Sequence, residues 1–320
     1  MTSSCPEPAA PLTRILVADR LHGPALTRYL AERLPGRQVR GAPLQEVGEA
    51  ELAWAEVLIG FQPPVDRSLA SLRWVHSTGA GVDAFLFRRP WPPRVLLTRT
   101  TGAFGARIAE YSLSRALFDS QGMAALMRLQ QQAEWQKIPP RELRGTRALV
   151  IGTGDIGRAV GRAFAALGSE VHGVSRGGEP CAPFMSVAAA TLLADAVADA
   201  DFIVVTVPLT EATYHLVGAR VLGRCHGAFL INAARGKVVD HDALLAALEA
   251  GHLRGAALDV FDVEPLPRES PLWRHPRVLV SPHVAALTRL DEAGSSFLDN
   301  LADLEAGRPA RTAVDPRRGY

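Results

Sequence analysis

Three side chains of different chemistry, Arg235, Glu264 and His283, stand directly after short apolar runs that are typical of buried strands. The imidazole of His283 can donate a proton near neutral pH, as the reduction of a carbonyl requires, and Glu264 can hydrogen-bond its other ring nitrogen. The guanidinium of Arg235 offers a forked donor to a carboxylate and to an oxygen on which negative charge develops. Together these groups predict the reduction of a 2-oxo acid to a 2-hydroxy acid.

This chemistry depends on a sheet that brings the three loops together. In a doubly wound parallel sheet the site lies beyond the carboxyl ends of the strands, so loops that are distant in sequence converge. Taken one at a time, the same residues have a simpler interpretation. An isolated arginine or glutamate is usually a solvated charge, and the other eight histidines lack a comparable setting.

A glycine-rich turn marks the cofactor site of such a sheet. Gly152, Gly154 and Gly157 follow an apolar run in the G-x-G-x-x-G spacing, with Asp155 and Ile156 between them. The first glycine allows a tight turn, the second lets a pyrophosphate approach the backbone, and the third lets helix and strand pack closely. A helical pattern and a second strand then complete a βαβ unit within about 30 residues. The pattern predicts a Rossmann-type dinucleotide-binding domain.

The end of the second strand of this unit indicates which dinucleotide is bound. Units that bind NAD usually carry Asp or Glu there to accept the ribose 2′-hydroxyl, whereas this chain has Ser175 and Arg176. A hydroxyl and a guanidinium are ligands for a 2′-phosphate. We therefore predict that NADP(H) is preferred and that NAD(H) is a second cofactor. In the alternative interpretation, Arg176 is a solvated loop arginine.

The length and composition predict an ordinary globular protein of two domains. A chain of 320 residues exceeds the size at which single cores stop growing, and short apolar runs alternate with helical patterns in both halves, as in α/β proteins. The net charge of +2 gives no basic stripe for nucleic acid. No apolar run approaches the ~20 residues that span a bilayer, so no membrane partner is expected.

The N-terminus and the cysteines predict a cytoplasmic protein. Residues 1–11 lack the basic and apolar segments of a signal peptide and are expected to be a loose tail. Cys5, Cys181 and Cys225 are scattered and odd in number, which favours a reducing compartment over a disulfide framework. They form no metal-ligand pattern, and we expect no metal site.

Two further segments suggest contacts with other molecules. The loop 77–83 places Ala80 between two glycines, Gly79 and Gly81, and can form a small nest of amides for an anion, although a simple strand-to-helix turn would look the same. Residues 123–144 are rich in glutamine and contain Trp135, which predicts an exposed arm with a partner surface. The alternative is that Trp135 packs on its own subunit.

Taken together, these motifs resemble those of the D-isomer-specific 2-hydroxyacid dehydrogenases along nearly the whole chain. The resemblance rests on Gly-Thr-Gly-Asp-Ile-Gly at 152–157, Asn-Ala-Ala-Arg-Gly at 232–236, Leu-Asp-Val-Phe at 258–261 running to Glu-Pro-Leu at 264–266, and Ser-Pro-His-Val-Ala at 281–285. The C-terminal third is most similar to the bacterial glyoxylate/hydroxypyruvate reductase A group, through residues 264–273 and 282–289. Glyoxylate and hydroxypyruvate are the substrates that this resemblance implies.

The resemblance also implies roles for individual residues. Arg235 would bind and polarise the substrate, Glu264 would pair with the histidine, and His283 would be the acid/base. The amides of Ala80 and Gly81 would bind the substrate carboxylate. The implied cofactor contacts include Asp259 at the nicotinamide carboxamide, together with Val207, Pro208, Thr213, Ala233, Arg235 and His283.

For the architecture, the resemblance implies a doubly wound dinucleotide-binding domain over 102–286. It also implies a smaller, flavodoxin-like α/β substrate domain that is discontinuous in sequence, formed by 1–101 and 287–320. Family members dimerise through their nucleotide domains, so we expect a homodimer with the arm around Trp135 at its interface. Two other functions stay open: reduction of a different 2-oxo acid, and a non-catalytic dinucleotide sensor like the corepressors that share this fold.

Overall fold

The computed structural model describes residues 11–102 and 104–320, and the chain divides into two compact units. One unit consists of Met1–Gly102 with Thr288–Tyr320, and the other of Ala103–Leu287. The predicted boundaries lie one residue from these. Most of the predicted N-terminal tail, including Cys5, lies outside the described residues.

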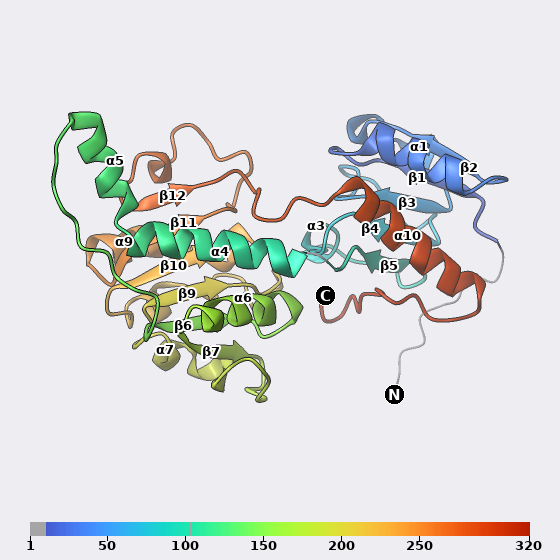
Figure 1. Ribbon diagram of the computed structural model, residues 1–320. Helices are drawn as coiled ribbons and strands as arrows, with labels where there is room; N and C mark the ends of the chain where they lie inside the picture. The colour runs from blue at the N-terminus through green and yellow to red at the C-terminus, as the bar shows by residue number, and fades with distance from the viewer. Residues whose placement is uncertain (1–10, 103) are drawn as a thin grey trace. The chain divides into compact units, whose positions relative to one another are not determined.

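The first unit is built on a five-stranded parallel sheet with the order β2-β1-β3-β4-β5. Its strands are β1 (Arg14–Val17), β2 (Gln38–Gly41), β3 (Val57–Gly60), β4 (Trp74–Ser77) and β5 (Leu96–Arg99). The helices α1 (Gly23–Arg33) and α10 (Leu290–Glu305) pack on one face (Figure 1), where Phe297 stacks on Trp74. The short helices α2 (Glu49–Trp54) and α3 (Asp83–Leu86) contribute to the core on the other face.

The second unit is built on a seven-stranded parallel sheet with the order β12-β11-β10-β9-β6-β7-β8. Its strands are β6 (Arg147–Ile151), β7 (Glu170–Ser175), β8 (Ser186–Ala189), β9 (Phe202–Val205), β10 (Ala228–Asn232), β11 (Leu253–Leu258) and β12 (Val278–Val280). The chain first builds outward from β6 through β7 to β8 and then resumes on the other side at β9. This reversal makes the sheet doubly wound, so the predicted α/β fold class is confirmed.

Of the helices in this unit, the first two precede the first strand of the sheet, and the others lie between its strands along the chain. The helices are α4 (Phe104–Ser120), α5 (Met123–Gln132), α6 (Asp155–Ala166), α7 (Leu193–Ala196), α8 (Ala219–Leu222) and α9 (His241–Glu249). α4 lies against α6 (Figure 1), where a Cβ at Gly105 would stand 3.0 Å from that of Ala159. Short 3₁₀ turns are η1 (Leu44–Glu46), η2 (Ala190–Leu192), η3 (Gly236–Val238) and η4 (Pro271–Trp273). None of the described helices combines the length and apolarity needed to cross a membrane.

Candidate active site

The glycine turn after β6 has the shape of a phosphate cradle. Gly152 lies at φ +107°, and a Cβ at Gly157 would overlap its carbonyl oxygen. No described atom lies within 4 Å of the place where a Cβ would stand on Gly154. α6 begins at Asp155, followed by the half-buried Ile156, so the first amides of the helix face this open space. Open backbone and helix amides fit the pyrophosphate of a dinucleotide.

The loop after β9 lies beside this turn. A Cβ at Gly152 would stand 3.0 Å from Cγ1 of Val207. The next loop residues are fixed by Thr213, whose hydroxyl donates to the carbonyl oxygen of Pro208 at 2.6 Å and accepts from the amide of Thr210 at 2.8 Å. Thr213 therefore shapes the loop, and the cofactor contacts of Val207, Pro208 and Thr213 stay predictions.

The turn after β7 carries the residues expected to select the cofactor. Ser175 ends the strand, and the exposed Arg176 follows it. The Ser175 hydroxyl accepts from the amide of Gly178 at 2.9 Å and lies 3.4 Å from Oε2 of Glu179, to which it donates. Glu179 was not predicted as a site residue. Glu179 stands four residues after the strand end, beyond Arg176, Gly177 and Gly178, and this spacing alone does not show that its side chain returns to Ser175.

Arg235, Glu264 and His283 follow three neighbouring strands, β10, β11 and β12, at the carboxyl edge of the sheet. His283 Nδ1 donates to Glu264 Oε2 at 2.8 Å, and the amide of Phe261 donates to Oε1 at 2.9 Å. Burial alone would raise the pKa of Glu264. The two hydrogen bonds and the charges of His283 and Arg235 outweigh burial and lower that pKa below its ordinary value. The structure thus places His283 and Arg235, two of the three predicted residues, close to the third, Glu264.

The loop after β10 is held against the loop after β11. Asn232 Nδ2 donates to the carbonyl oxygen of Arg235 at 3.0 Å, which closes the turn that contains the half-buried Ala233. A Cβ at Gly236 would overlap the backbone of Phe261. Glycine is therefore required at 236 for the two loops to touch, and this contact places Arg235 near the glutamate.

Asp259 holds the loop that carries His283. The amide of His283 donates to the Asp259 carbonyl at 2.7 Å, and the amides of Val284 and Ala285 donate to its carboxylate at 3.0 and 2.8 Å. The hydroxyl of Ser281 donates to the same carboxylate at 2.6 Å. Asp259 is 1% exposed, so these bonds compensate the burial of its charge. Its implied contact with the nicotinamide stays a prediction.

A buried tyrosine extends this network and was not predicted. Tyr111, on α4, lies 2.8 Å from the Ser281 hydroxyl. Because Ser281 gives its single hydrogen to Asp259, the Tyr111 hydroxyl is the donor to Ser281. Burial raises the pKa of Tyr111, which keeps it a neutral donor. Its position in the middle of a long helix gave no signal in the sequence.

In the first unit, the predicted nest follows β4. The hydroxyl of Ser77 accepts from the amide of Gly79 at 3.3 Å and fixes the start of the loop. The carbonyl of Ala80 accepts from Arg99 at 3.3 Å. The amides of Ala80 and Gly81 donate to no described residue, and both residues are half-buried. The loop can therefore offer two adjacent donors to an anion.

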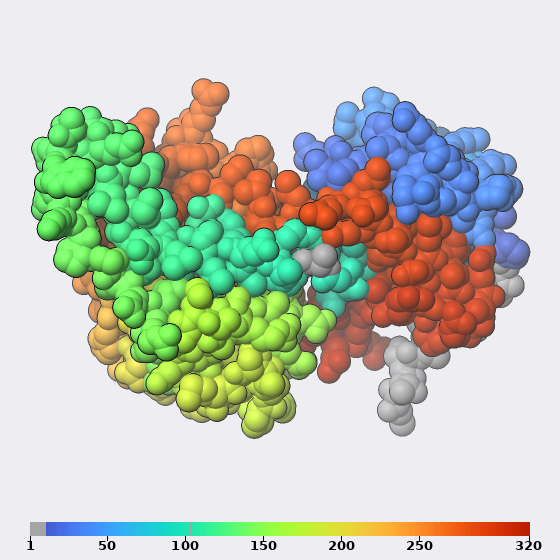
Figure 2. Space-filling view, viewed as in Figure 1, coloured from blue at the N-terminus to red at the C-terminus, as the bar shows by residue number. Residues whose placement is uncertain are grey.

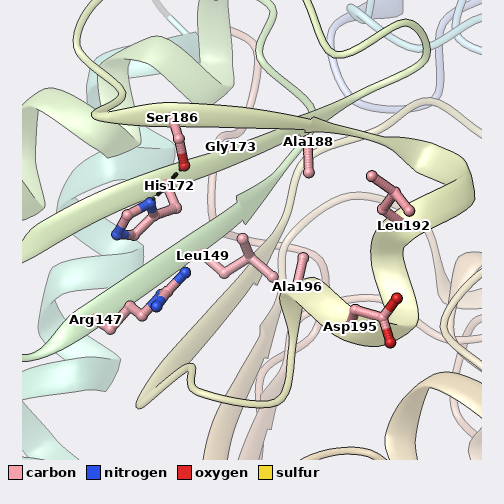
Figure 3. A pocket seen from close by; sticks show the side chains of 9 residues that line it. All are labelled: Arg147, Leu149, His172, Gly173, Ser186, Ala188, Leu192, Asp195 and Ala196. Carbon is pink, nitrogen blue, oxygen red and sulfur yellow. Dashed lines mark hydrogen bonds between the residues drawn. The ribbon is translucent and has the colours of Figure 1, made fainter.

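A separate cavity of about 310 Å³ lies in the second unit, on the strands β6, β7 and β8 (Figure 3). His172 and Ser186 line it and are joined by a hydrogen bond of 2.8 Å. None of the residues found to line this cavity is a predicted site residue. Among the described residues, no group of three or more His, Cys, Asp or Glu side chains is arranged to hold a metal ion.

Comparison with known proteins shows which class of protein has this fold and site. The family model for the NAD binding domain of D-isomer specific 2-hydroxyacid dehydrogenases matches residues 113–285. The chain belongs to this family of enzymes, and the resemblance predicted from its motifs is confirmed.

Particular relatives are similar over most of their length. A glyoxylate/hydroxypyruvate reductase A of Citrobacter koseri is 33% identical over 91% of this chain and 94% of its own. A D-isomer specific 2-hydroxyacid dehydrogenase of Xanthobacter autotrophicus, solved with NADPH and MES, is 34% identical at a TM-score of 0.85, covering 97% of this chain and 100% of its own. An NADPH-dependent glyoxylate/hydroxypyruvate reductase of Sinorhizobium meliloti was solved with NADP and sulfate. It is 28% identical at a TM-score of 0.85, and the match covers 96% of this chain and 100% of its own.

Proposed function

We propose that this enzyme reduces a small 2-oxo acid of the glyoxylate or hydroxypyruvate kind to the D-2-hydroxy acid, with NADPH as the preferred hydride donor. The observation that carries the proposal is the 2.8 Å hydrogen bond between His283 and Glu264 beside Arg235, at the edge of the sheet that holds the glycine turn. The names of the Citrobacter and Sinorhizobium relatives support the substrate class.

The mechanism assigns proton transfer to His283. When bound, the nicotinamide supplies a hydride to the carbonyl carbon. Glu264 binds Nδ1 of His283, fixes the orientation of the ring and leaves Nε2 as the nitrogen that donates a proton to the carbonyl oxygen. The imidazole becomes neutral in this step and regains its proton from solvent before the next turnover.

Arg235 and the nest loop bind the substrate in this proposal. The guanidinium of Arg235 binds the carboxylate and stabilises the charge that develops on the reacting oxygen. The amides of Ala80 and Gly81 are two adjacent donors that we assign to a substrate carboxylate. A 2-oxo acid satisfies both sets of donors, whereas a simple aldehyde lacks the carboxylate they require.

Ser175 and Arg176 support the preference for NADP(H). Their hydroxyl and guanidinium are suited to a 2′-phosphate, and the Xanthobacter and Sinorhizobium structures contain NADPH and NADP. The glycine turn and the amides of α6 would hold the pyrophosphate. Cytoplasmic location belongs to the same proposal, and the free thiols of Cys181 and Cys225 are consistent with it.

The second copy of the chain is the partner that we propose for the arm. No described residue of α5 is buried within its own chain, and Trp135 is 99% exposed. This segment lies at the surface of its unit (Figure 2, green). A homodimer that covers it would remove a large apolar side chain from water.

The direct test is a matrix of kcat/KM values for glyoxylate, hydroxypyruvate, pyruvate and phenylpyruvate with NADPH and with NADH. We expect the two small polar substrates with NADPH to give the highest values. Preference for phenylpyruvate would instead indicate a reductase for a larger 2-oxo acid. Tight binding of NADPH without turnover of any substrate would indicate a dinucleotide sensor and contradict the proposal.

A further inference from the structure

In the turn after β7, the acidic side chain of Glu179 lies against Ser175, a residue that is expected to bind the 2′-phosphate. The side chain of Glu179 folds back over the turn, and its carboxylate lies where a Cβ on Gly177 would overlap it. Its Oε2 lies 3.4 Å from the Ser175 hydroxyl. The turn is fixed by the 2.9 Å bond from the Gly178 amide to the same hydroxyl and by the left-handed φ of +82° at Gly178. The carboxylate is therefore held near the strand end.

The hydroxyl of Ser175 has a single hydrogen, and in this arrangement it is given to Glu179. A 2′-phosphate that binds Ser175 must displace the carboxylate from that hydrogen. It must also approach a negative charge with its own charge of about −1.5 to −2, and like charges at this range repel even in a solvated setting. Glu179 thus opposes the phosphate at the position where Ser175 and Arg176 favour it.

The ribose of NAD(H) meets the opposite situation. Its 2′-hydroxyl is a donor, and a carboxylate at the end of the second strand is the usual acceptor for it in NAD-binding units. Here that strand ends in Ser175, but the turn returns a carboxylate to the same place from four residues further on. A single turn therefore presents one group suited to each cofactor.

We propose that Glu179 is a specificity-determining residue that narrows the preference for NADP(H) and allows NAD(H) to bind as well. This inference rests on the proposed use of NADP(H) through Ser175 and Arg176. It assigns to Glu179 an opposite effect on the two cofactors, so a change in their ratio is its signature. A purely structural role in the turn would change both affinities in the same direction.

The test is to measure the dissociation constants of NADPH and NADH by titrating nucleotide fluorescence with the wild-type protein and with Glu179→Gln. The amide keeps the size of the side chain, removes its charge and can donate to a phosphate. We expect NADPH to bind about five- to twenty-fold more tightly and NADH about two- to five-fold more weakly. Glu170→Gln is the matched control, because Glu170 is an exposed glutamate at the opposite end of the same strand.

The outcomes separate this inference from the proposed reaction. A ratio of affinities that stays within two-fold of wild type in Glu179→Gln, or that shifts toward NADH, would overturn the role of Glu179. If the ratio shifts as expected but no 2-oxo acid is reduced, Glu179 is supported and the proposed reaction fails. Arg176→Gln tests the underlying assumption separately, because it should weaken NADPH binding and leave NADH binding within two-fold. An unchanged affinity of Arg176→Gln for NADPH would mean that the 2′-phosphate binds elsewhere. That result would overturn the roles assigned to Arg176 and to Glu179.

Discussion

His283 adopts a backbone conformation that is uncommon for residues other than glycine. Its φ is +53°, in the left-handed region that L side chains rarely occupy. The hydrogen bond from its amide to the Asp259 carbonyl, 2.7 Å long, helps to hold it there. Such conformations persist where the surroundings fix them, and they cluster at functional sites. The strain here orients an imidazole whose Nδ1 is already bound by Glu264.

Removing this imidazole should affect the chemical step more than substrate binding. We expect His283→Ala to lower kcat by about 10²- to 10⁴-fold, the usual contribution of a positioned proton donor. Steady-state kinetics with NADPH and glyoxylate measure the effect, with His226→Ala as the control because His226 is exposed and lies outside the site. An unchanged kcat in His283→Ala would remove the histidine from the mechanism.

The site residues that could be predicted are those that directly follow a recognisable strand in the sequence. Arg235, Glu264 and His283 could be predicted because each follows an apolar run, and parallel strands bring such ends to one edge. Tyr111 and Glu179 could not, because their roles arise from contacts between segments. Tyr111 reaches Ser281 across 170 positions of sequence, and Glu179 acts only because two glycines fold it back.

Some strands of the two sheets could be recognised from their own residues, whereas others form only because they pair with a neighbouring strand. Central strands such as β3, β9 and β10 are buried along their whole length, and each is almost entirely a run of apolar residues, which is typical of buried parallel strands. The edge strands β2 and β8 were not predicted, since all their residues are exposed or half-buried and neither strand carries a run of large apolar side chains. Pairing with one buried neighbour, β1 or β7, makes them strands.

The loop after β12 depends on one carboxylate, and this gives a test that separates two roles of Asp259. An asparagine has one acceptor oxygen and would place an N–H group against the amide of Val284 or Ala285. We expect Asp259→Asn to lower kcat by about 10- to 100-fold through misplacement of His283. Asp242→Asn, an exposed site on α9, is the control. A rise in KM for NADPH with kcat unchanged would favour a role in binding the nicotinamide alone.

The helix α5 and the segment after it carry exposed apolar side chains, and the proposed homodimer interface rests on them. Met127 is 49% exposed and Trp135 is 99% exposed. If a second copy covers them, Trp135→Glu should weaken the dimer by introducing a charge into a dry interface. Sedimentation velocity at micromolar concentration should show a dimer for wild type and a shift toward monomer for the variant.

Met185→Glu provides the control for this experiment. Met185 is 69% exposed and lies next to β8, outside the arm. The Met185→Glu variant should have the same sedimentation coefficient as the wild-type protein. A wild-type protein that is monomeric, or a Trp135→Glu variant that dimerises as well as wild type, would contradict the proposed interface.

The stability of the first unit should fall on acidification because of a buried neutral histidine. Trp74 Nε1 donates to Thr98 Oγ1 at 2.8 Å, and this hydroxyl in turn faces His76 Nδ1 at 2.7 Å. The hydroxyl gives its hydrogen to Nδ1, so the ring is neutral and protonated at Nε2, which lies 3.3 Å from Thr100 Oγ1. Burial lowers the pKa of His76 from 6.5 to about 3.

The sign of the effect follows from this depressed pKa. Between pH 6.5 and 3 the unfolded chain binds a proton at His76 that the folded unit does not, so each step to lower pH favours unfolding. The full window corresponds to a loss on the order of 3–5 kcal/mol. Glu56 adds to this below its ordinary pKa of 4.5. Burial would raise its pKa, but hydrogen bonds from Thr13, Arg14 and Arg73 lower it to about 2.

Urea unfolding at pH 7.5, 6.5, 5.5 and 4.5, followed by tryptophan fluorescence, measures this dependence because Trp74 lies in the same core. We expect the free energy of unfolding of the first unit to fall steadily below pH 6.5. His76→Gln, which cannot be protonated, should be less stable at neutral pH but lose less stability between pH 6.5 and 4.5. His226→Gln should retain the wild-type slope. Equal slopes for wild type and His76→Gln between pH 6.5 and 4.5 would show that the acid sensitivity has a source other than His76.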